Sequence, residues 1–211
     1  FMKIKICGIT RENEVELLNE LHVDYAGFVL FFEKSKRNMD LGRAVELKNR
    51  LKSTRSVAVV VEPTLEQARL IEKAGFDVLQ VHGKLAENIE EQCDIPIWKA
   101  VNVKNDDGEV YNSQLETFLK DDRISAIVMD AADAGSGETF DWNVLLNEDF
   151  GAKDFVLAGG LNPINVGSAI LKLNPDVVDV SSGVEYTDKT IMGKDARKVV
   201  EFVENTRNTL R

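Results

Sequence analysis

Eight short apolar runs rich in β-branched residues recur along the 211-residue chain at intervals of about 25 residues, and each is followed by a segment with helical spacing of its apolar residues. This alternation predicts eight strands, each followed by a helix. The predicted strands span residues 3–7, 24–30, 56–61, 77–81, 96–101, 124–130, 154–158 and 177–181.

Capping residues and helix breakers indicate where several of the helices begin and end. Thr10 is the predicted N-cap of the first helix, and the third begins after Pro63 and ends at Gly75. Asn162 and Pro163 have the order expected of an N-cap and a first helical residue. The first helix is predicted to begin near residue 10, and the others to span 40–51, 64–74, 85–92, 113–120, 142–146, 163–173 and 195–209.

Alternating strands and helices within one short chain are typical of two α/β architectures, a doubly wound open sheet and a closed barrel. The strands are mostly continuous apolar runs, as expected when both faces of a parallel sheet are covered. No linker or shift in composition divides the chain. Eight units in about the minimum length of a barrel favour a single (β/α)8 TIM barrel domain over residues 1–211, with the open sheet as the alternative.

Composition excludes several classes of partner and site. The net charge of −10 argues against nucleic acid and anionic membrane surfaces as partners. The two histidines and two cysteines show no paired metal-ligand spacing, so we expect no metal, no other cofactor and no disulfide framework. With no secretory pattern at the start and no apolar run of about 18 residues, the expected location is the cytoplasm. The sequence specifies no oligomeric state.

In a barrel of this kind, the catalytic and binding residues lie where the strands end and the following loops begin. Cys7 is the last residue of the first predicted strand, where a small core residue and a functional thiol are equally plausible interpretations. Alternation along the strand places Lys5 on the same face, one level deeper, and an interior lysine needs a partner. Asp179 occupies the matching face of the last strand. We therefore predict that Lys5 forms an ion pair with Asp179 and that the positive charge of Lys5 favours the Cys7 thiolate.

Asp130 closes an otherwise apolar strand. It could cap the following loop, or act as a general acid or base at the mouth of the barrel. The segment 132–139 that follows is rich in glycine, which is weak evidence for phosphate binding and stronger evidence for mobility.

Glycines in the last two loops predict a phosphate site. Gly159 and Gly160 follow the seventh strand, and Ser182 and Gly183 follow the eighth; these are the loops that commonly bind phosphate in barrels. A phosphorylated small molecule is therefore the expected ligand. Two further strand-end groups are substrate-binding candidates, namely Arg37, alternatively part of a solvated basic turn, and His82, alternatively a neutral hydrogen-bonded side chain. Together with the four loop residues they form the predicted substrate-binding set: Arg37, His82, Gly159, Gly160, Ser182 and Gly183.

Motifs along almost the whole chain resemble those of the phosphoribosylanthranilate isomerase family. The most specific in combination are KICGIT at 5–10, AGGLNPINV at 158–166 and DVSSGVE at 179–185. Shorter matches lie between them, at residues 27–28, 35–37, 80–83, 98–100, 129–131 and 137–142.

The resemblance implies a reaction and roles for the matching residues. Members of the family perform an Amadori rearrangement of N-(5-phosphoribosyl)anthranilate, an aldose–ketose isomerisation in tryptophan biosynthesis. By resemblance, Asp130 would protonate the furanose oxygen and Cys7, as thiolate, would remove the proton at C2′. Arg37 would contact the anthranilate, and the two glycine loops would hold the phosphate. No metal is needed.

Three segments depart from the family pattern. Lys84-Leu85 replaces an acidic pair, Gly135-Ser136-Gly137 replaces a Gly-Gly-Thr-Gly run, and residues 191–195 only approximate Gly-x-Lys-Asp. These departures leave the implied acid and base intact but affect the loops around the substrate.

Two other functions fit parts of the sequence. One is another phosphosugar barrel enzyme. An epimerase of this fold, however, requires a His/Asp metal cluster, and the synthase for indole-glycerol phosphate uses lysine and glutamate motifs that are absent here. A catalytically silent phosphate-binding barrel is the other. Retention of both Cys7 and Asp130 favours an active enzyme.

Overall fold

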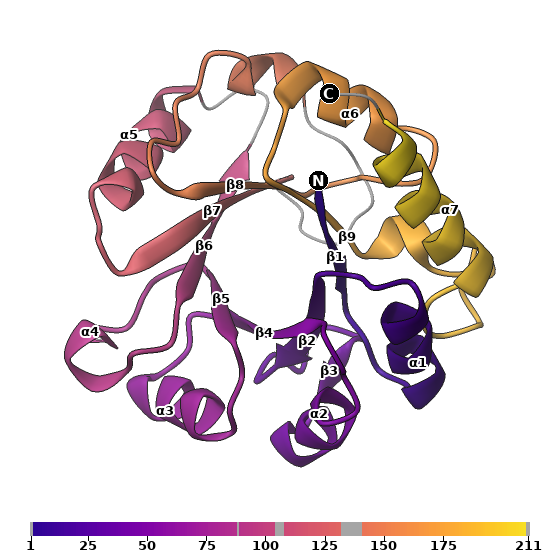
Figure 1. Ribbon diagram of the computed structural model, residues 1–211. Helices are drawn as coiled ribbons and strands as arrows, with labels where there is room; N and C mark the ends of the chain where they lie inside the picture. Colours follow the sequence, from indigo (N-terminus) through magenta and orange to yellow (C-terminus); the bar gives the residue numbers. More distant parts are fainter. Residues whose placement is uncertain (1, 88, 104–107, 132–140, 210–211) are drawn as a thin grey trace.

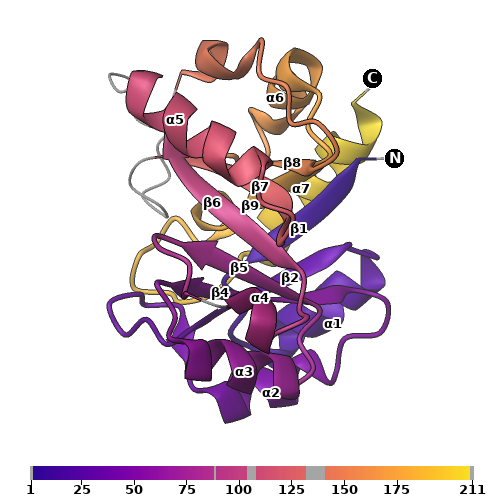
Figure 2. The ribbon, with the colours of Figure 1, turned by 90° about the vertical axis from the view of Figure 1, so that its left-hand side faces the viewer.

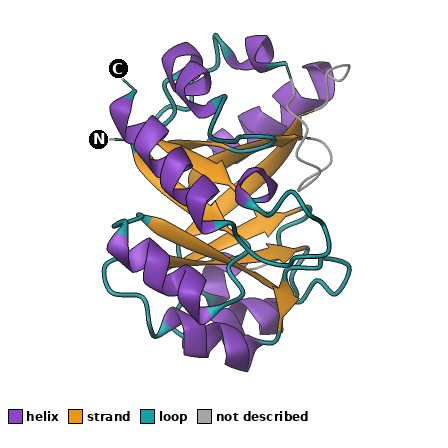
Figure 3. Ribbon diagram, turned by 90° about the vertical axis from the view of Figure 1, so that its right-hand side faces the viewer, coloured by secondary structure: helices purple, strands orange, loops and turns teal. Residues whose placement is uncertain are grey.

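A computed structural model describes residues 2–87, 89–103, 108–131 and 141–209. Its parallel strands follow the order β1-β9-β8-β7-β6-β5-β4-β2, and a further pairing of β1 with β2 closes the ring. Figure 1 shows this ring with the helices outside it, and Figures 2 and 3 show the same arrangement from two sides. The predicted (β/α)8 barrel is confirmed, and the doubly wound alternative is wrong because an open sheet would leave β1 and β2 unpaired.

The eight barrel strands agree with the predicted ones to within two residues at either end. They are β1 (Lys3–Cys7), β2 (Tyr25–Leu30), β4 (Arg55–Val61), β5 (Val78–His82), β6 (Ile97–Val103), β7 (Ile124–Ala131), β8 (Asp154–Leu157) and β9 (Val177–Val180). A ninth strand, β3 (Asn38–Met39), was not predicted; it pairs with β2 in the loop that follows that strand.

The helices follow the strands in the predicted order. They are α1 (Glu12–Glu20), α2 (Leu41–Lys48), α3 (Leu65–Lys73), α4 (Ile89–Gln92), α5 (Gly108–Leu119), α6 (Val166–Leu173) and α7 (Ala196–Asn208), with 3-10 helices η1 (Trp142–Leu145) and η2 (Ser182–Val184). No helix in these described ranges is long and apolar enough to cross a membrane.

Four predicted helix starts are wrong. Helix α4 begins at Ile89 rather than near residue 85, and α5 begins at Gly108 rather than near residue 113. The N-cap of α1 is Arg11 rather than Thr10, because Glu14 turns back to accept hydrogen bonds from the backbone N–H groups of both. Helix α6 begins at Val166 rather than after Asn162, whose side chain accepts hydrogen bonds from two backbone N–H groups in the turn before the helix. The chain reaches α6 through this turn, so the loop after β8 is longer than the sequence indicates.

Alternation along the strands divides the apolar side chains between two cores. One fills the inside of the barrel and includes Tyr25, Val57 and Trp98. The other lies between the barrel and the helices and includes Ile6 and Leu47. Because both faces of every strand are covered, the strands are the continuous apolar runs seen in the sequence.

Helix packing on the barrel gives a direct stability test. Leu47 of α2 is fully buried, whereas Leu171 of α6 is 67% exposed. Leu47→Ala should lower the free energy of unfolding by roughly 2–5 kcal/mol, since it leaves a cavity between helix and sheet. Leu171→Ala, the same change on the surface, should lower it by no more than about 0.5 kcal/mol. Urea denaturation of both variants measures this, and equal losses would contradict the assigned outer core.

Candidate active site

Cys7 ends β1 at the mouth of the barrel, half-buried. Its neighbour across the ladder to β2 is Gly27. A Cβ on Gly27 would lie 2.7 Å from the Cys7 sulfur, so the glycine makes the room in which the thiol sits. The role of this glycine was missed in the sequence because it depends on the register between two strands.

The predicted pairing of Lys5 with Asp179 is confirmed. The two residues are opposite one another in the β1–β9 ladder, and Lys5 Nζ lies 2.6 Å from Asp179 Oδ2. Lys5 is fully buried and Asp179 is 7% exposed. Burial alone would lower the pKa of Lys5, but the carboxylate of Asp179 and the sulfur of Cys7 outweigh it and raise this pKa. Lys5 is therefore an ammonium ion inside the barrel.

Two lysines act on the Cys7 thiol. Burial raises the pKa of Cys7, while Lys5 and, less strongly, Lys194 lower it. Asp179 raises it further. Lys5 therefore lowers the pKa of Cys7, as predicted, but burial outweighs this effect and the net pKa of the thiol is raised. In the free protein the thiol is mainly protonated at neutral pH, and the two ammonium groups reduce the cost of forming the thiolate.

Arg37 lies against the residue that follows Cys7. A Cβ on Gly8 would come within 2.5 Å of Arg37 Cδ, so Gly8 admits this side chain rather than a ligand. Arg37 Nε donates to Glu185 Oε1 at 2.6 Å. Burial would raise the pKa of Glu185, but Arg37, Lys194 and Lys36 together lower it to about 2. The guanidinium is thus fixed beside Gly8, the neighbour of Cys7, by an ionised carboxylate.

His82 ends β5 as predicted and is half-buried. Its Nε2 lies 3.0 Å from the side-chain nitrogen of Gln80. Burial, with the positive charges of Lys5 and Lys99, lowers the pKa of His82 to about 4. The imidazole is neutral at pH 7, so it can hydrogen-bond to a ligand without adding charge.

Asp130 lies at the end of β7, next to Asn102 in the ladder to β6, and is 9% exposed. In the ring, β9 and β8 separate β7 from the β1 strand of Cys7. The carboxyl and the thiol therefore reach the mouth from nearly opposite sides. The glycine-rich segment 132–139 falls outside the described residues.

The structure brings the two glycine loops into contact. A Cβ on Gly183 would overlap the carbonyl oxygen of Leu161, so the loop after β9 packs directly on the loop after β8. Gly159 and Gly160 have φ angles of 81° and 69°, in the left-handed region that favours glycine. The backbone N–H groups of Gly159, Gly160, Ser182 and Gly183 donate no hydrogen bond to another described residue. They are donors available to an anion.

Sequence reasoning missed two residues of the site, Glu185 and Lys194. Both are buried, at 5% and 4% exposure, and each contacts the other. Lys194 lies in the segment that departs from the family pattern, but it occupies the lysine position of that pattern. The signal that could have found the pair is a glutamate at the end of one loop motif and a lysine before the last helix.

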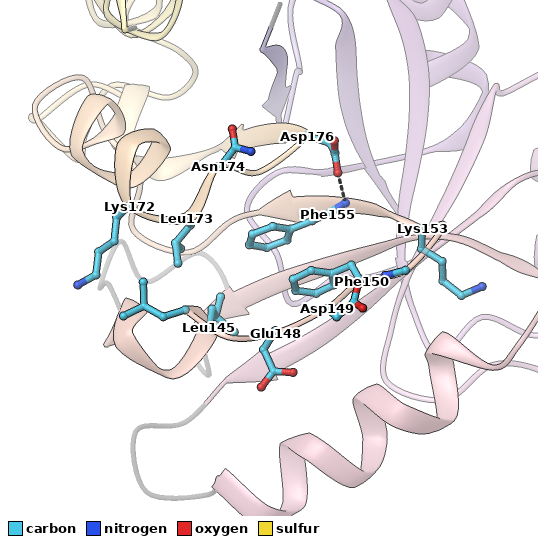
Figure 4. A pocket seen from close by; sticks show the side chains of 12 residues that line it. Leu145, Glu148, Asp149, Phe150, Lys153, Phe155, Lys172, Leu173, Asn174 and Asp176 are labelled. Atoms are coloured by element: carbon cyan, nitrogen blue, oxygen red, sulfur yellow. Dashed lines mark hydrogen bonds between the residues drawn. The ribbon is translucent and has the colours of Figure 1, made fainter. Parts of the chain in front are cut away.

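A shallow pocket of about 210 Å3 lies at the opposite end of the barrel (Figure 4). Phe155 at the start of β8 and Asp176 just before β9 are among its lining residues, so it opens at the amino ends of these strands. Catalytic residues of this fold lie at the carboxyl ends of the strands, so this pocket at the amino ends is not expected to be the active site. In the described ranges no group of three or more His, Cys, Asp or Glu side chains could hold a metal ion.

Known proteins are similar to this chain in both sequence and fold. The family profile described as N-(5′-phosphoribosyl)anthranilate (PRA) isomerase matches residues 4–205. The enzyme of that name from Clostridium acetobutylicum is 39% identical over 214 residues, covering 98% of each chain. The crystal structure of phosphoribosyl anthranilate isomerase from Thermotoga maritima superimposes with a TM-score of 0.80 at 31% identity, covering 98% of this chain and 99% of that one.

A further solved structure carries a ligand. Phosphoribosyl anthranilate isomerase in complex with reduced 1-(o-carboxyphenylamino)-1-deoxyribulose 5-phosphate matches with a TM-score of 0.78 at 31% identity, again over 98% of this chain and 99% of that one. A profile match over nearly the whole chain, together with relatives of this similarity, shows the family. The chain belongs to the N-(5′-phosphoribosyl)anthranilate isomerase family.

Proposed function

We propose that this chain isomerises N-(5′-phosphoribosyl)anthranilate to 1-(2-carboxyphenylamino)-1-deoxyribulose 5-phosphate, the reaction of its family in tryptophan biosynthesis. The observation that carries the proposal is the position of Cys7 and Asp130 on opposite sides of one barrel mouth, beside two glycine loops in contact. One end of a phosphosugar can be held while its other end lies between an acid and a base. The enzyme works in the cytoplasm.

Asp130 acts as the general acid and Cys7 as the general base. Asp130 protonates the furanose ring oxygen, the C1′–O bond breaks and the nitrogen lone pair forms a Schiff base. The Cys7 thiolate then removes the C2′ proton, and the electrons of that bond form the C1′–C2′ double bond of an enolamine. Tautomerisation of the enolamine, with a proton added at C1′, gives the ketose.

Charges around the mouth suit this substrate. Arg37 is the partner of the anthranilate carboxylate, and neutral His82 contributes a hydrogen bond. The phosphate is held by the N–H groups of Gly159, Gly160, Ser182 and Gly183. Lys5 acts from below, where its positive charge favours the thiolate over the thiol.

The direct test of this function is consumption of N-(5′-phosphoribosyl)anthranilate by the purified protein, followed by loss of substrate fluorescence. A catalytically silent phosphate-binding barrel would bind the product analogue without turning over substrate, and that outcome would overturn the proposal.

Removing the acid or the base should each lower kcat by roughly 10²–10⁴-fold. Asp130→Asn keeps the shape of the side chain but cannot donate the proton, and Cys7→Ser replaces the thiol with a much weaker base. Cys93→Ser is the matched control, because Cys93 follows α4, at the end of the barrel away from the mouth. Steady-state kinetics checks all three. If either site variant kept the parental kcat, its role would be wrong.

Loss of the buried ammonium should make Cys7 harder to ionise. Lys5→Met is expected to raise the pKa of the thiol by about 1 or more, because an opposite charge within hydrogen-bonding range typically shifts a pKa by that much. The pH dependence of alkylation by iodoacetamide measures this in a Cys93→Ser background.

Lys3→Met is the control for the Lys5 variant. Lys3 lies on the same strand and pairs with Asp154, but this pair is 42% exposed and distant from the thiol. A double variant, Lys5→Met with Asp179→Leu, avoids an unpaired buried carboxylate if the single variant is unstable. Because Asp179 itself raises the thiol pKa, the double variant is compared with Asp179→Leu alone. A thiol pKa that is no higher in Lys5→Met than in the parent, or no higher in the double variant than in Asp179→Leu, would contradict the assigned effect of Lys5.

A charge placed in the phosphate site should weaken binding. Gly160→Asp and Gly160→Asn have similar shapes, and both side chains tolerate the left-handed backbone better than others do. We expect the KM of the Asp variant to be at least about tenfold above that of the Asn variant, since like charges about 4 Å apart near a protein surface repel by roughly 4 kcal/mol. Equal KM values would place the phosphate elsewhere. Gly183 is unsuitable for this test because any side chain there would overlap Leu161.

A further inference from the structure

A second buried lysine lies beside the proposed base. Lys194 is 4% exposed and reaches the site from the segment between η2 and α7, which we call the strap (residues 186–195). Its Nζ donates to the carbonyl oxygen of Ser181 at 3.0 Å and lies 3.3 Å from both Ser181 Oγ and Glu185 Oε1. Burial lowers the pKa of Lys194, and the carboxylate of Glu185 opposes this shift. A buried ammonium is costly unless it is paired. Lys194 is paired, and its partners belong to the loop after β9.

The strap is fastened to the loop that follows Cys7. The backbone N–H of Lys194 donates to Glu14 Oε1 at 2.7 Å, and Glu14 Oε2 accepts from the N–H groups of Thr10 and Arg11 at 2.7 and 3.1 Å. Glu14 is 3% exposed. One buried carboxylate thus joins the strap to Thr10 and Arg11, three and four residues after Cys7. The position of Lys194 is therefore fixed by its backbone, independently of its ammonium group.

Hydrogen bonds connect Lys194 to Cys7 in one direction. Ser181 Oγ donates to the carbonyl oxygen of Cys7 at 3.1 Å and can accept from Lys194. The charged groups that act on the thiol are Lys5 and Asp179 from below and Lys194 from the strap. Lys194 is thus a second cation beside Cys7, on a different element from Lys5.

Ion pairs connect Lys194 to Arg37 in the other direction. Glu185 Oε1 lies within 3.3 Å of Lys194 Nζ and 2.6 Å of Arg37 Nε, and Glu185 Oε2 lies 2.9 Å from Lys36 Nζ. Three cations share this one carboxylate, so the group carries a net positive charge. Such a group favours an anionic ligand, because its single carboxylate does not balance the positive charges around it.

We propose that Lys194 and Glu185 are positioning residues for the isomerase reaction: Glu185 holds Arg37 over Gly8 to meet the substrate carboxylate, and Lys194 holds Glu185 while supporting the Cys7 thiolate. The proposal rests on the roles of Cys7 and Arg37 given above. It joins the two halves of the site, since one lysine serves the base and, through Glu185, the substrate-binding arginine. Neither residue touches the reacting atoms.

The first test removes the charge of Lys194 and keeps its hydrogen-bonding ability. In a Cys93→Ser background, Lys194→Gln should raise the pKa of Cys7 by about 1, as expected for loss of a nearby cation. The alkylation rate by iodoacetamide as a function of pH is the measurement, and it needs no substrate. Lys194→Arg should keep the parental thiol pKa, and Lys194→Met provides a second neutral variant should Lys194→Gln be poorly folded.

Lys198→Met is the matched control. Lys198 Nζ donates to the backbone oxygen of Glu185 at 2.8 Å and to Thr187 Oγ1 at 2.9 Å, so it secures the same loop, but it is not among the groups that act on the thiol. Its loss should leave the thiol pKa unchanged. A thiol pKa that is equal in Lys194→Gln, Lys194→Met and the parent would overturn the role of Lys194.

The second test separates Glu185 from Lys194. Glu185→Gln should raise KM by about tenfold, because Arg37 loses the charge-assisted hydrogen bond that holds it in place for the substrate. The same variant should not raise the thiol pKa, since it removes a negative charge. A general loosening of the loop would move both quantities in both variants. An unchanged KM would overturn the role of Glu185. If the parent protein lacks isomerase activity but Lys194→Gln still shifts the thiol pKa, the proposed function fails while the contact between Lys194 and Cys7 stands.

Discussion

Closure of the sheet by β1 is the constraint on which the rest of the structure depends. This strand pairs with β2 on one side and with β9 on the other, so residues near the start and near the end of the chain become neighbours. The ion pair between Lys5 and Asp179 spans that seam inside the barrel. Either side chain alone would be a buried unpaired charge, which is strongly destabilising. The seam and its ion pair therefore support one another.

The same seam assembles the chemistry. Cys7 sits at the upper end of β1, and the loop after β9 brings Ser181 and Glu185 to it. The strap returns Lys194 to the same place before α7 begins. The thiol is consequently surrounded by charges from β1, β9 and the strap. Burial makes its thiolate costly and the two lysines reduce that cost, which is a setting in which small changes of charge have a measurable effect on ionisation.

Much of the fold and part of the site could be predicted because they depend on local periodicity. Continuous β-branched runs marked the strands, and alternation along two of them predicted the Lys5–Asp179 pair. Contacts set by packing could not be predicted in this way. The space that Gly27 leaves for the thiol depends on register, the strap 186–195 has no periodic pattern, and the turn after Asn162 imitates a helix start. Strand β3 has only two residues, too few to give a pattern.

The central claim is that Cys7 takes the C2′ proton and Asp130 gives a proton to the ring oxygen. The most direct measurement is the isotope effect on single turnover, comparing substrate that carries hydrogen or deuterium at C2′. In Cys7→Ser, proton removal becomes the slow step, so the account predicts an isotope effect larger than in the parent. In Asp130→Asn, ring opening becomes slow and the isotope effect should fall towards one. The reverse pattern, or the same isotope effect in both variants, would contradict the account.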